Sequence, residues 1–302
     1  MWIVNLNYWG CNQYITQRAL GANLQTARTG ILFAGFLKLL MPVIVMLPGI
    51  AAYVLNKNGH LPLENKDGAY SAILGFLPAG LKGLSIAALT AAIVASLAGK
   101  MNSISTIFTL DIYKKYINKD ADDKRQVRMG RWVVLAAIIF SLAFTWNDVL
   151  KIGGEGGFTF IQKYTGFISP GVFAMFILGM FWKRTTGAAA IAGLITGFVL
   201  AIFFNSYAVD IFGKETLLYT AFEYQKEIKG SVETIVEIPF LINMGWSFFF
   251  TIVVMVGISL AGPKVNPKAF AIDKEMFKLK PGTIMLIVVT LLILAALYAR
   301  FW

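Results

Sequence analysis

The chain has 302 residues, of which 57% are hydrophobic and 14% are charged, and its mean hydropathy is +0.68. This composition excludes a soluble globular domain and predicts an all-α polytopic membrane protein. The formal net charge of +11 comes mainly from basic residues in short loops, so it indicates orientation in a membrane rather than nucleic-acid binding. One cysteine, Cys11, and one histidine, His60, exclude an intramolecular disulfide and a Cys/His metal cluster.

We expect about eight membrane segments, which in chain order cover residues 2–9, 31–55, 81–110, 132–146, 158–182, 187–204, 238–260 and 282–302. At a rise of 1.5 Å per residue, most of them reach across roughly 30 Å of hydrocarbon. The first segment is too short to span and lacks the basic start of a signal peptide. We therefore expect this sequence to begin inside a longer protein.

The basic residues gather in alternate loops. They follow the first, third, fifth and seventh segments, and the group after the third is the largest: Lys114, Lys115, Lys119, Lys124, Arg125, Arg128 and Arg131. The intervening loops are acidic or balanced. By the positive-inside rule this alternation places the basic loops in the cytoplasm and the C-terminus outside.

The third segment carries small residues at every fourth position: Gly83, Ala87, Ala91, Ala95 and Gly99. The row beside it contains Ala88, Ala92 and Ser96. Such rows form a narrow ridge that lets neighbouring helices approach closely, which predicts a helix in the middle of a membrane bundle. A hydroxyl on such a helix either binds a neighbouring helix or belongs to a binding site.

Three places combine apolar surroundings with polar side chains. Lys38 lies seven residues inside the second segment, where its ammonium either extends back to the interface or faces a central cavity. The first segment carries Asn5, Tyr8, Trp9 and Asn12 at helical spacing. This face suits either a sugar or an interfacial anchor.

The third place is Gln162, one turn before a Pro/Gly-rich break at residues 166–171. A polar side chain just before such a break is typical of a substrate site in a transporter.

No segment contains an aspartate, a glutamate or a histidine. A proton relay and a membrane-embedded hydrolase both need such groups, so we expect no enzyme and no proton-coupled transporter. Neutral oxygens inside the segments suit a hard cation such as sodium. We expect no cofactor apart from sodium as a coupling ion.

Four stretches, at residues 7–20, 35–49, 102–116 and 160–183, together resemble the solute:sodium symporter family, most closely its sodium/galactose and sodium/glucose members. The resemblance implies a LeuT-type fold, in which two inverted five-helix repeats surround a site at mid-membrane. Residues 1–183 would then form the second repeat and residues 184–302 three peripheral helices. The first repeat would be missing from this sequence.

The resemblance also implies roles for individual residues. Matched position by position, the sugar contacts fall on Asn5, Lys38 and Gln162. The inner gate falls on Tyr8, with Trp9 beside it. The sodium ligands fall on the carbonyl of Ala92 and on Ala95 and Ser96. Ala95 departs from the family pattern, which has a serine there.

These inferences predict sodium-coupled symport of a sugar across the cytoplasmic membrane by alternating access, with sugar, sodium and the lipid bilayer as partners. The alternative within the family is a symporter for another small solute, such as an inositol, an amino acid or a carboxylate. Rivals of other classes are a membrane-embedded enzyme and a scaffold subunit. The scaffold would use the small row Ala189, Gly193 and Gly197 for assembly.

Overall fold

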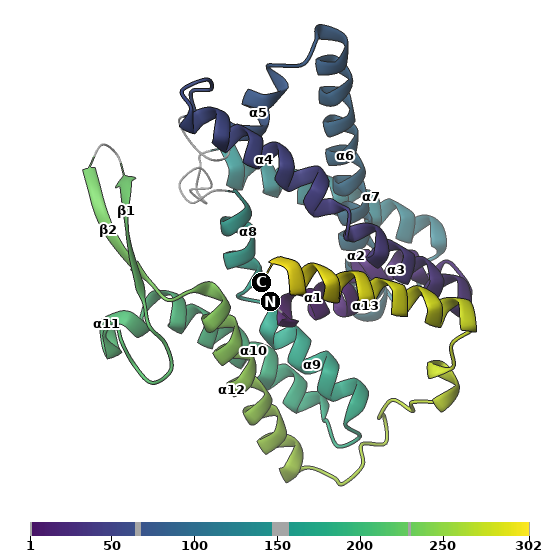
Figure 1. Ribbon diagram of the computed structural model, residues 1–302. Coiled ribbons are helices and arrows are strands. Elements are labelled where there is room, and N and C mark those ends of the chain that lie inside the picture. The colour runs from purple at the N-terminus through teal and green to yellow at the C-terminus, as the bar shows by residue number, and fades with distance from the viewer. Residues whose placement is uncertain (1, 64–67, 147–156, 229–230, 302) are drawn as a thin grey trace. The chain divides into compact units, whose positions relative to one another are not determined.

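The computed structural model describes residues 2–63, 68–146, 157–228 and 231–301 (Figure 1). Within these ranges, six helices are long and apolar enough to cross a membrane, and a seventh apolar helix, Ser169–Phe181, is shorter. Strand is confined to one hairpin in the described chain. The protein is therefore a mostly helical, multi-pass integral membrane protein, as its composition predicts.

The chain forms two compact units. The first contains residues 1–15 and 152–278, and the second contains residues 16–151 and 279–302. This division reflects which residues lie close in space, whereas the predicted boundary at residue 183 separates a topological repeat from peripheral helices. The repeat division accordingly stays a prediction.

The first unit contains the helices and strands of both of its sequence ranges. In chain order these are α1 (Trp2–Leu6), η1 (Asn7–Cys11), α8 (Gly157–Thr165), α9 (Ser169–Phe181), α10 (Gly187–Ser206), α11 (Ala208–Phe212), β1 (Phe222–Ile228), β2 (Ser231–Glu237), α12 (Phe240–Ala261) and η5 (Lys274–Phe277). Helix α2 (Gln13–Leu20) runs from this unit into the second.

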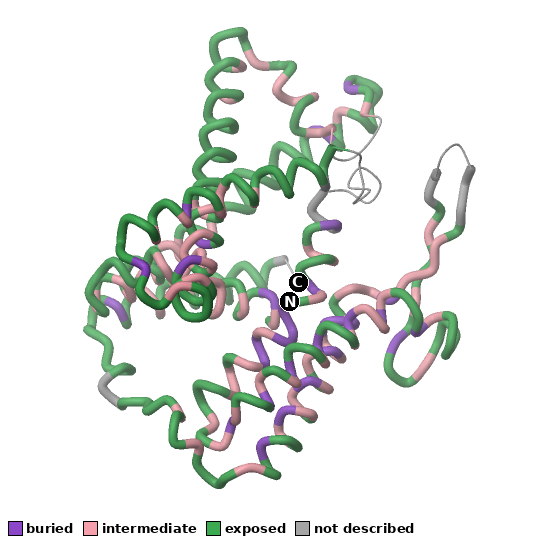
Figure 2. Tube along the Cα trace, turned by 180° about the vertical axis from the view of Figure 1, so that it is seen from behind, coloured by how far each residue is buried: buried purple, intermediate pink, exposed green. Residues whose placement is uncertain are grey.

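Helices α9, α10 and α12 form the most tightly packed part of the first unit, which Figure 2 shows as the concentration of buried residues. Ala189, Gly193, Gly197 and Ala201 lie on one face of α10 and are all buried. At the closest point, a methyl group added to Gly197 would lie 2.8 Å from the Cα atom of Gly171 in α9. The small row thus brings two helix backbones together within the chain itself.

A β-hairpin precedes α12, and the apolar segments of the sequence do not predict it. Strands β1 and β2 pair antiparallel, with Phe222 opposite Glu237. Beneath it, Tyr219 is buried and its hydroxyl donates to the carbonyls of Ala208 (2.8 Å) and Gly213 (3.1 Å). Burial raises the pKa of this Tyr219 hydroxyl, so it stays a hydrogen-bond donor at neutral pH.

The second unit contains the longest helices. They are α3 (Leu24–Lys38), α4 (Met41–Lys57), α5 (Ala69–Leu74), α6 (Ala79–Thr106), η3 (Ile107–Ile117), α7 (Asp123–Trp146) and α13 (Pro281–Phe301). Asn23 caps α3, because its side-chain oxygen accepts the backbone N–H of Thr26 at 2.8 Å. Helix α6 continues into the π-helix η3, which carries Asp111 beyond the predicted end of this segment.

Within its own unit, the small-residue ridge of α6 is not packed against another helix, so its place inside a bundle stays a prediction. Gly83 has no atom near the place where a side chain would start, and none of the most apolar part of the helix is buried. The physical reason is that α6 packs on α7 further along, where Gly130 of α7 meets Ser105. The ridge itself has no covering helix among the described residues of its unit.

Candidate functional site

The first polar segment is not one continuous α-helix. The α-helix ends at Leu6, and η1 is a π-helix that contains Tyr8 and Trp9. The prediction that Asn5, Tyr8, Trp9 and Asn12 share one α-helical face is therefore wrong, since a π-turn spaces side chains differently and Asn12 has extended backbone. The rings of Tyr8 and Trp9 do meet, edge to face, with centroids 5.9 Å apart.

Asn7, which the sequence analysis does not single out, contacts α9 next to the predicted gate residues. Its side-chain nitrogen donates to the hydroxyl of Ser169, 3.1 Å away, and Ser169 is only 2% exposed in the first turn of α9. The side-chain oxygen of Asn7 is buried without a hydrogen-bond partner among the described residues. A second amide two residues after Asn5 in an apolar segment was the available signal. The contact ties the π-helix to α9.

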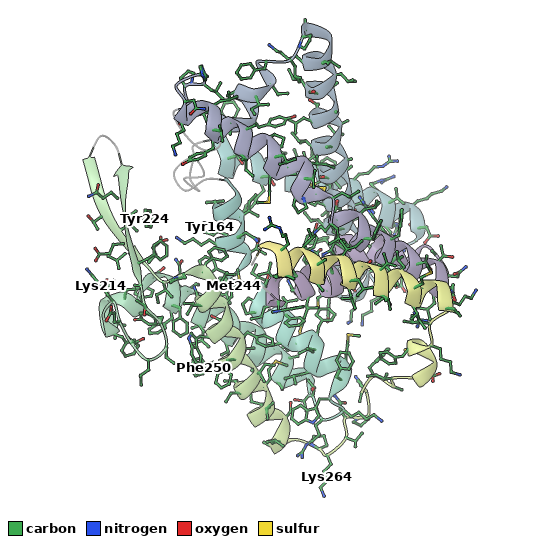
Figure 3. The ribbon with its side chains drawn as sticks, viewed as in Figure 1. Tyr164, Lys214, Tyr224, Met244, Phe250 and Lys264 are labelled. Carbon is green, nitrogen blue, oxygen red and sulfur yellow. The ribbon has the colours of Figure 1, made fainter. Side chains whose placement is uncertain are left out.

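Gln162 lies half-buried in α8, one turn before this helix ends at Thr165. The predicted break is confirmed, because α9 begins only at Ser169. Gly166, inside the break, packs so closely against Met244 of α12 that a side chain would not fit without movement. Figure 3 labels Met244 on α12, which makes this contact, and Tyr164 near the end of α8.

Next to Gln162, Lys163 forms an ion pair with Glu237 at the end of β2. The ammonium nitrogen lies 2.7 Å from a carboxylate oxygen, and the two side chains are 13% and 24% exposed. This pair connects α8 to the segment that leads from the hairpin into α12. It therefore restrains the helix that carries Gln162.

Lys38 lies at a short turn within one candidate membrane span, Leu24–Lys57. It is the last residue of α3, a turn follows at Leu39, and α4 starts at Met41 with Pro42 in its first turn. The carbonyl end of a helix favours a cation, and proline at the start of the next helix needs no backbone donor. Lys38 is exposed on the described surface of its unit.

The predicted sodium ligands lie on α6, far from any helix end. Ala92 and Ser96 line a groove of about 320 Å³ together with Lys100, whereas Ala95 is not among the residues that line it. Among the described residues that line this groove, Ser96 alone offers a side-chain hydroxyl. Its donor set fits sodium in kind, since sodium binds neutral oxygen, but one hydroxyl and the backbone carbonyls make an incomplete shell.

The predicted residues fall into two groups by unit. Asn5, Tyr8, Trp9 and Gln162 belong to the first unit, and Lys38, Ala92, Ala95 and Ser96 belong to the second. Within the first unit, the structure brings α1 and η1 against α9.

One feature is common to the predicted sugar contacts. Asn5 lies two residues before the π-helix, Lys38 ends α3, and Gln162 lies three residues before the end of α8. Each is thus within one turn of a helix discontinuity. Such discontinuities free backbone polar groups, and in transporters they form substrate sites at mid-membrane.

The sequence was compared with protein families and with known proteins, and it is similar to sodium-coupled symporters. The family model described as "Sodium:solute symporter family" matches residues 2–197. A sodium/glucose cotransporter of Vibrio parahaemolyticus is 37% identical over 320 residues, which cover all of this chain and 53% of that protein. The human sodium/myo-inositol cotransporter 2 is 36% identical over 219 residues, which cover 67% of this chain and 32% of that protein. The chain thus spans about half, or less, of the length of these relatives.

Proposed function

Since this chain belongs to the sodium:solute symporter family, we propose that it forms the substrate-binding half of a sodium-coupled symporter of a sugar or a closely related polyol. The proposed substrate contacts are Asn5, Lys38 and Gln162, and Tyr8 with Trp9 forms the proposed gate. Sodium is proposed to bind at Ala92, Ala95 and Ser96, with the energy of its gradient coupled to the solute by alternating access. In this proposed arrangement, residues 1–183 form the second five-helix repeat and residues 184–302 form three peripheral helices.

The observation that carries this proposal is the position of the three substrate contacts at helix discontinuities. An amide, an ammonium and a second amide offer several donors and two carbonyl acceptors for hydroxyl groups. No carboxylate faces them from α1, α3 or α8, because these helices contain none. This set suits a neutral polyhydroxylated ring, whereas a carboxylate substrate would favour an arginine or a helix N-terminus.

Within the polyols, a glucose-like sugar is the first candidate. The support is the similarity to a sodium/glucose cotransporter along the whole chain. An inositol is the second candidate, because relatives named as sodium/myo-inositol cotransporters share 36% identity over two thirds of the chain. Both are six-membered rings with hydroxyls around the edge, so the same donors could bind either one.

The test is uptake into proteoliposomes that contain the product of the complete gene. Labelled glucose, galactose and myo-inositol are supplied with an inward sodium gradient, with potassium in place of sodium, and with sodium equal on both sides. We expect accumulation of one of these solutes only with the sodium gradient. Accumulation without sodium, or of none of the three polyols, would contradict the proposal.

A matched pair of variants ties the result to the site. Gln162→Ala removes a proposed substrate contact, and Gln225→Ala removes the same group from the exposed hairpin. The first should reduce uptake at subsaturating sugar by about tenfold, which corresponds to the roughly 1–2 kcal/mol of one or two hydrogen bonds. The second should leave uptake unchanged.

A further inference from the structure

A groove of about 660 Å³ lies between α6, η3 and α7 in the second unit, and none of the residues assigned to transport above lines it. One wall is polar and carries Asn102, Ser105, Thr106 and Thr109. The rest of the lining includes the apolar side chains of Ala98, Met101 and Val134 and the polar side chains of Gln126 and Arg131. A groove that offers both polar and apolar side chains suits an amphiphile.

The polar wall contains an unsatisfied donor. Thr109 is 6% exposed, and its hydroxyl is buried without a hydrogen-bond partner among the described residues. Thr106 differs, because its hydroxyl donates to the carbonyl of Asn102 at 2.8 Å. A buried hydroxyl without a partner is unfavourable, typically by about 1–3 kcal/mol. The hydroxyl of Thr109 is therefore a position where a ligand oxygen would be stabilised.

Cations line the adjoining face of α7. Lys124, Arg128 and Arg131 lie at positions i, i+4 and i+7, and all three line a second groove beside the first. Arg131 lines both grooves. Asp123 is also at the second groove, but none of the ion pairs among the described residues involves these three cations. Positive charge thus continues from the second groove to the hydroxyl wall of the first.

The three cations of α7 lie just before the part of this helix that enters the membrane. Arg131 is the last basic residue before the apolar part of α7, which starts at Trp132. The preceding loop is on the predicted cytoplasmic side. Clustered lysine and arginine immediately cytoplasmic of a membrane helix attract anionic lipid headgroups. The apolar side chains of the first groove then continue into the hydrocarbon, where acyl chains lie.

We propose that the groove between α6, η3 and α7 binds an anionic phospholipid from the cytoplasmic leaflet. Arg131, with Arg128 and Lys124, would hold the phosphate group. Thr109 would donate to an ester or glycerol oxygen, and Met101 and Val134 would contact an acyl chain. This site is independent of the proposed transport function, because it contains none of the transport residues.

The experiment measures lipid binding to the purified product of the complete gene. Native mass spectrometry titrates dioleoyl-phosphatidylglycerol and dioleoyl-phosphatidylcholine in separate arms, and a third arm uses inorganic phosphate. We expect phosphatidylglycerol to bind at least tenfold more tightly than phosphatidylcholine. Each cation removed among Lys124→Gln, Arg128→Gln and Arg131→Gln should weaken phosphatidylglycerol binding by about fivefold.

Two controls separate this site from general attraction to a basic protein. The triple variant Lys264→Gln, Lys268→Gln and Lys280→Gln removes the same charge from another predicted cytoplasmic loop and should leave the affinity within twofold. Thr109→Val keeps the size of the side chain and all three cations and should weaken binding by about threefold to tenfold. The α7 triple variant combines Lys124→Gln, Arg128→Gln and Arg131→Gln. An equal loss of phosphatidylglycerol affinity in the α7 triple variant and in the loop triple variant would overturn the proposal. So would phosphate binding as strong as that of the lipid.

A separate measurement guards against a folding defect. The melting temperature of each variant is recorded in detergent before lipid is added, and again with saturating phosphatidylglycerol. We expect the lipid to raise the melting temperature of the unmodified protein and of the loop control, but not of the α7 triple variant. An equal rise in the α7 triple variant would also overturn the proposal.

Discussion

Lys163 and Glu237 are 74 residues apart in the chain, yet their charged groups lie 2.7 Å from each other. The pair joins α8, which carries Gln162, to the last residue of β2. Both groups are largely buried, so each depends on the other more than a surface ion pair would. The hairpin is therefore mechanically linked to the helix that ends at the proposed substrate site.

We predict that breaking this pair weakens transport through the position of Gln162. Lys163→Met or Glu237→Gln leaves one charge without this partner, at a cost of roughly 1–3 kcal/mol. The apparent affinity for sugar should fall by about fivefold to a hundredfold, measured as the half-saturating sugar concentration. The double variant Lys163→Glu with Glu237→Lys should recover most of the affinity. If the reversed pair is as impaired as the single variants, the link does not act through this contact.

Gly197→Ala should destabilise the bundle of α9, α10 and α12. The added methyl group would lie 2.8 Å from the Cα atom of Gly171 and 3.1 Å from the hydroxyl of Thr251, which forces the helices apart. Overpacking of this kind costs about 1–3 kcal/mol and should lower the melting temperature. Gly179→Ala in α9 is the control, because no atom lies within 4 Å of its added methyl group. It should be neutral or slightly stabilising, since alanine favours helix.

The sequence predicts the helical part of this fold well, because long apolar segments can hardly be anything else in a membrane. The Pro/Gly break after Gln162 was also predictable from residue types. The turn after Lys38 also falls where Lys38 and Pro42 interrupt the second apolar segment, although apolar residues continue across it. The small row at Gly193 and Gly197 packs within the chain, which residue types alone cannot distinguish from use in assembly, whereas Gly83 on the α6 ridge contacts nothing within its unit.

The site was harder to predict than the helices. A periodicity of 3.6 residues was assumed for the first segment, and the π-helix η1 changes which side chains share a face there. The bond between Asn7 and Ser169 joins positions 162 residues apart, which no local pattern can indicate. The hairpin before α12 is not predictable from apolar segments, because its two strands are short and rich in polar residues.

Orientation can be tested with single cysteines in a Cys11→Ser background. Asn58→Cys and Leu217→Cys lie in predicted outside loops, and Lys119→Cys and Lys268→Cys lie in predicted cytoplasmic loops; all four positions are exposed. We expect an impermeant maleimide to label only the first two in intact cells. All four should react after permeabilisation, which serves as the control. Labelling at Lys119 or Lys268 in intact cells would reverse the orientation and would also place the proposed lipid site outside.

Lys38→Ala in the product of the complete gene should reduce sugar affinity strongly. A hydrogen bond from an ammonium to a hydroxyl is worth roughly 1.5–3 kcal/mol, which corresponds to about tenfold to a hundredfold in affinity. The control is Lys57→Ala, which removes a lysine from the last turn of α4. It should leave the half-saturating sugar concentration unchanged. Unchanged uptake in Lys38→Ala itself would mean that this side chain extends to the interface instead of the substrate.

The predicted sodium site on α6 offers few side-chain oxygens. Ser96 supplies one hydroxyl in its groove, and Ala95, on the neighbouring small row, supplies none. Sodium is a hard cation that is held by oxygen, so each neutral oxygen in its shell contributes. Ala95→Ser would add a hydroxyl while keeping the row small enough for close packing.

We therefore expect Ala95→Ser to tighten sodium binding in the product of the complete gene. One added polar contact is worth roughly 1–2 kcal/mol, so the half-saturating sodium concentration for sugar uptake should fall by about fivefold to thirtyfold. Ser96→Ala should shift it in the opposite direction. Ala91→Ser, one turn earlier on the row of Ala95, should have no effect. If Ala95→Ser and Ala91→Ser behave alike, position 95 does not face the ion, and sodium has to be assigned to other oxygens.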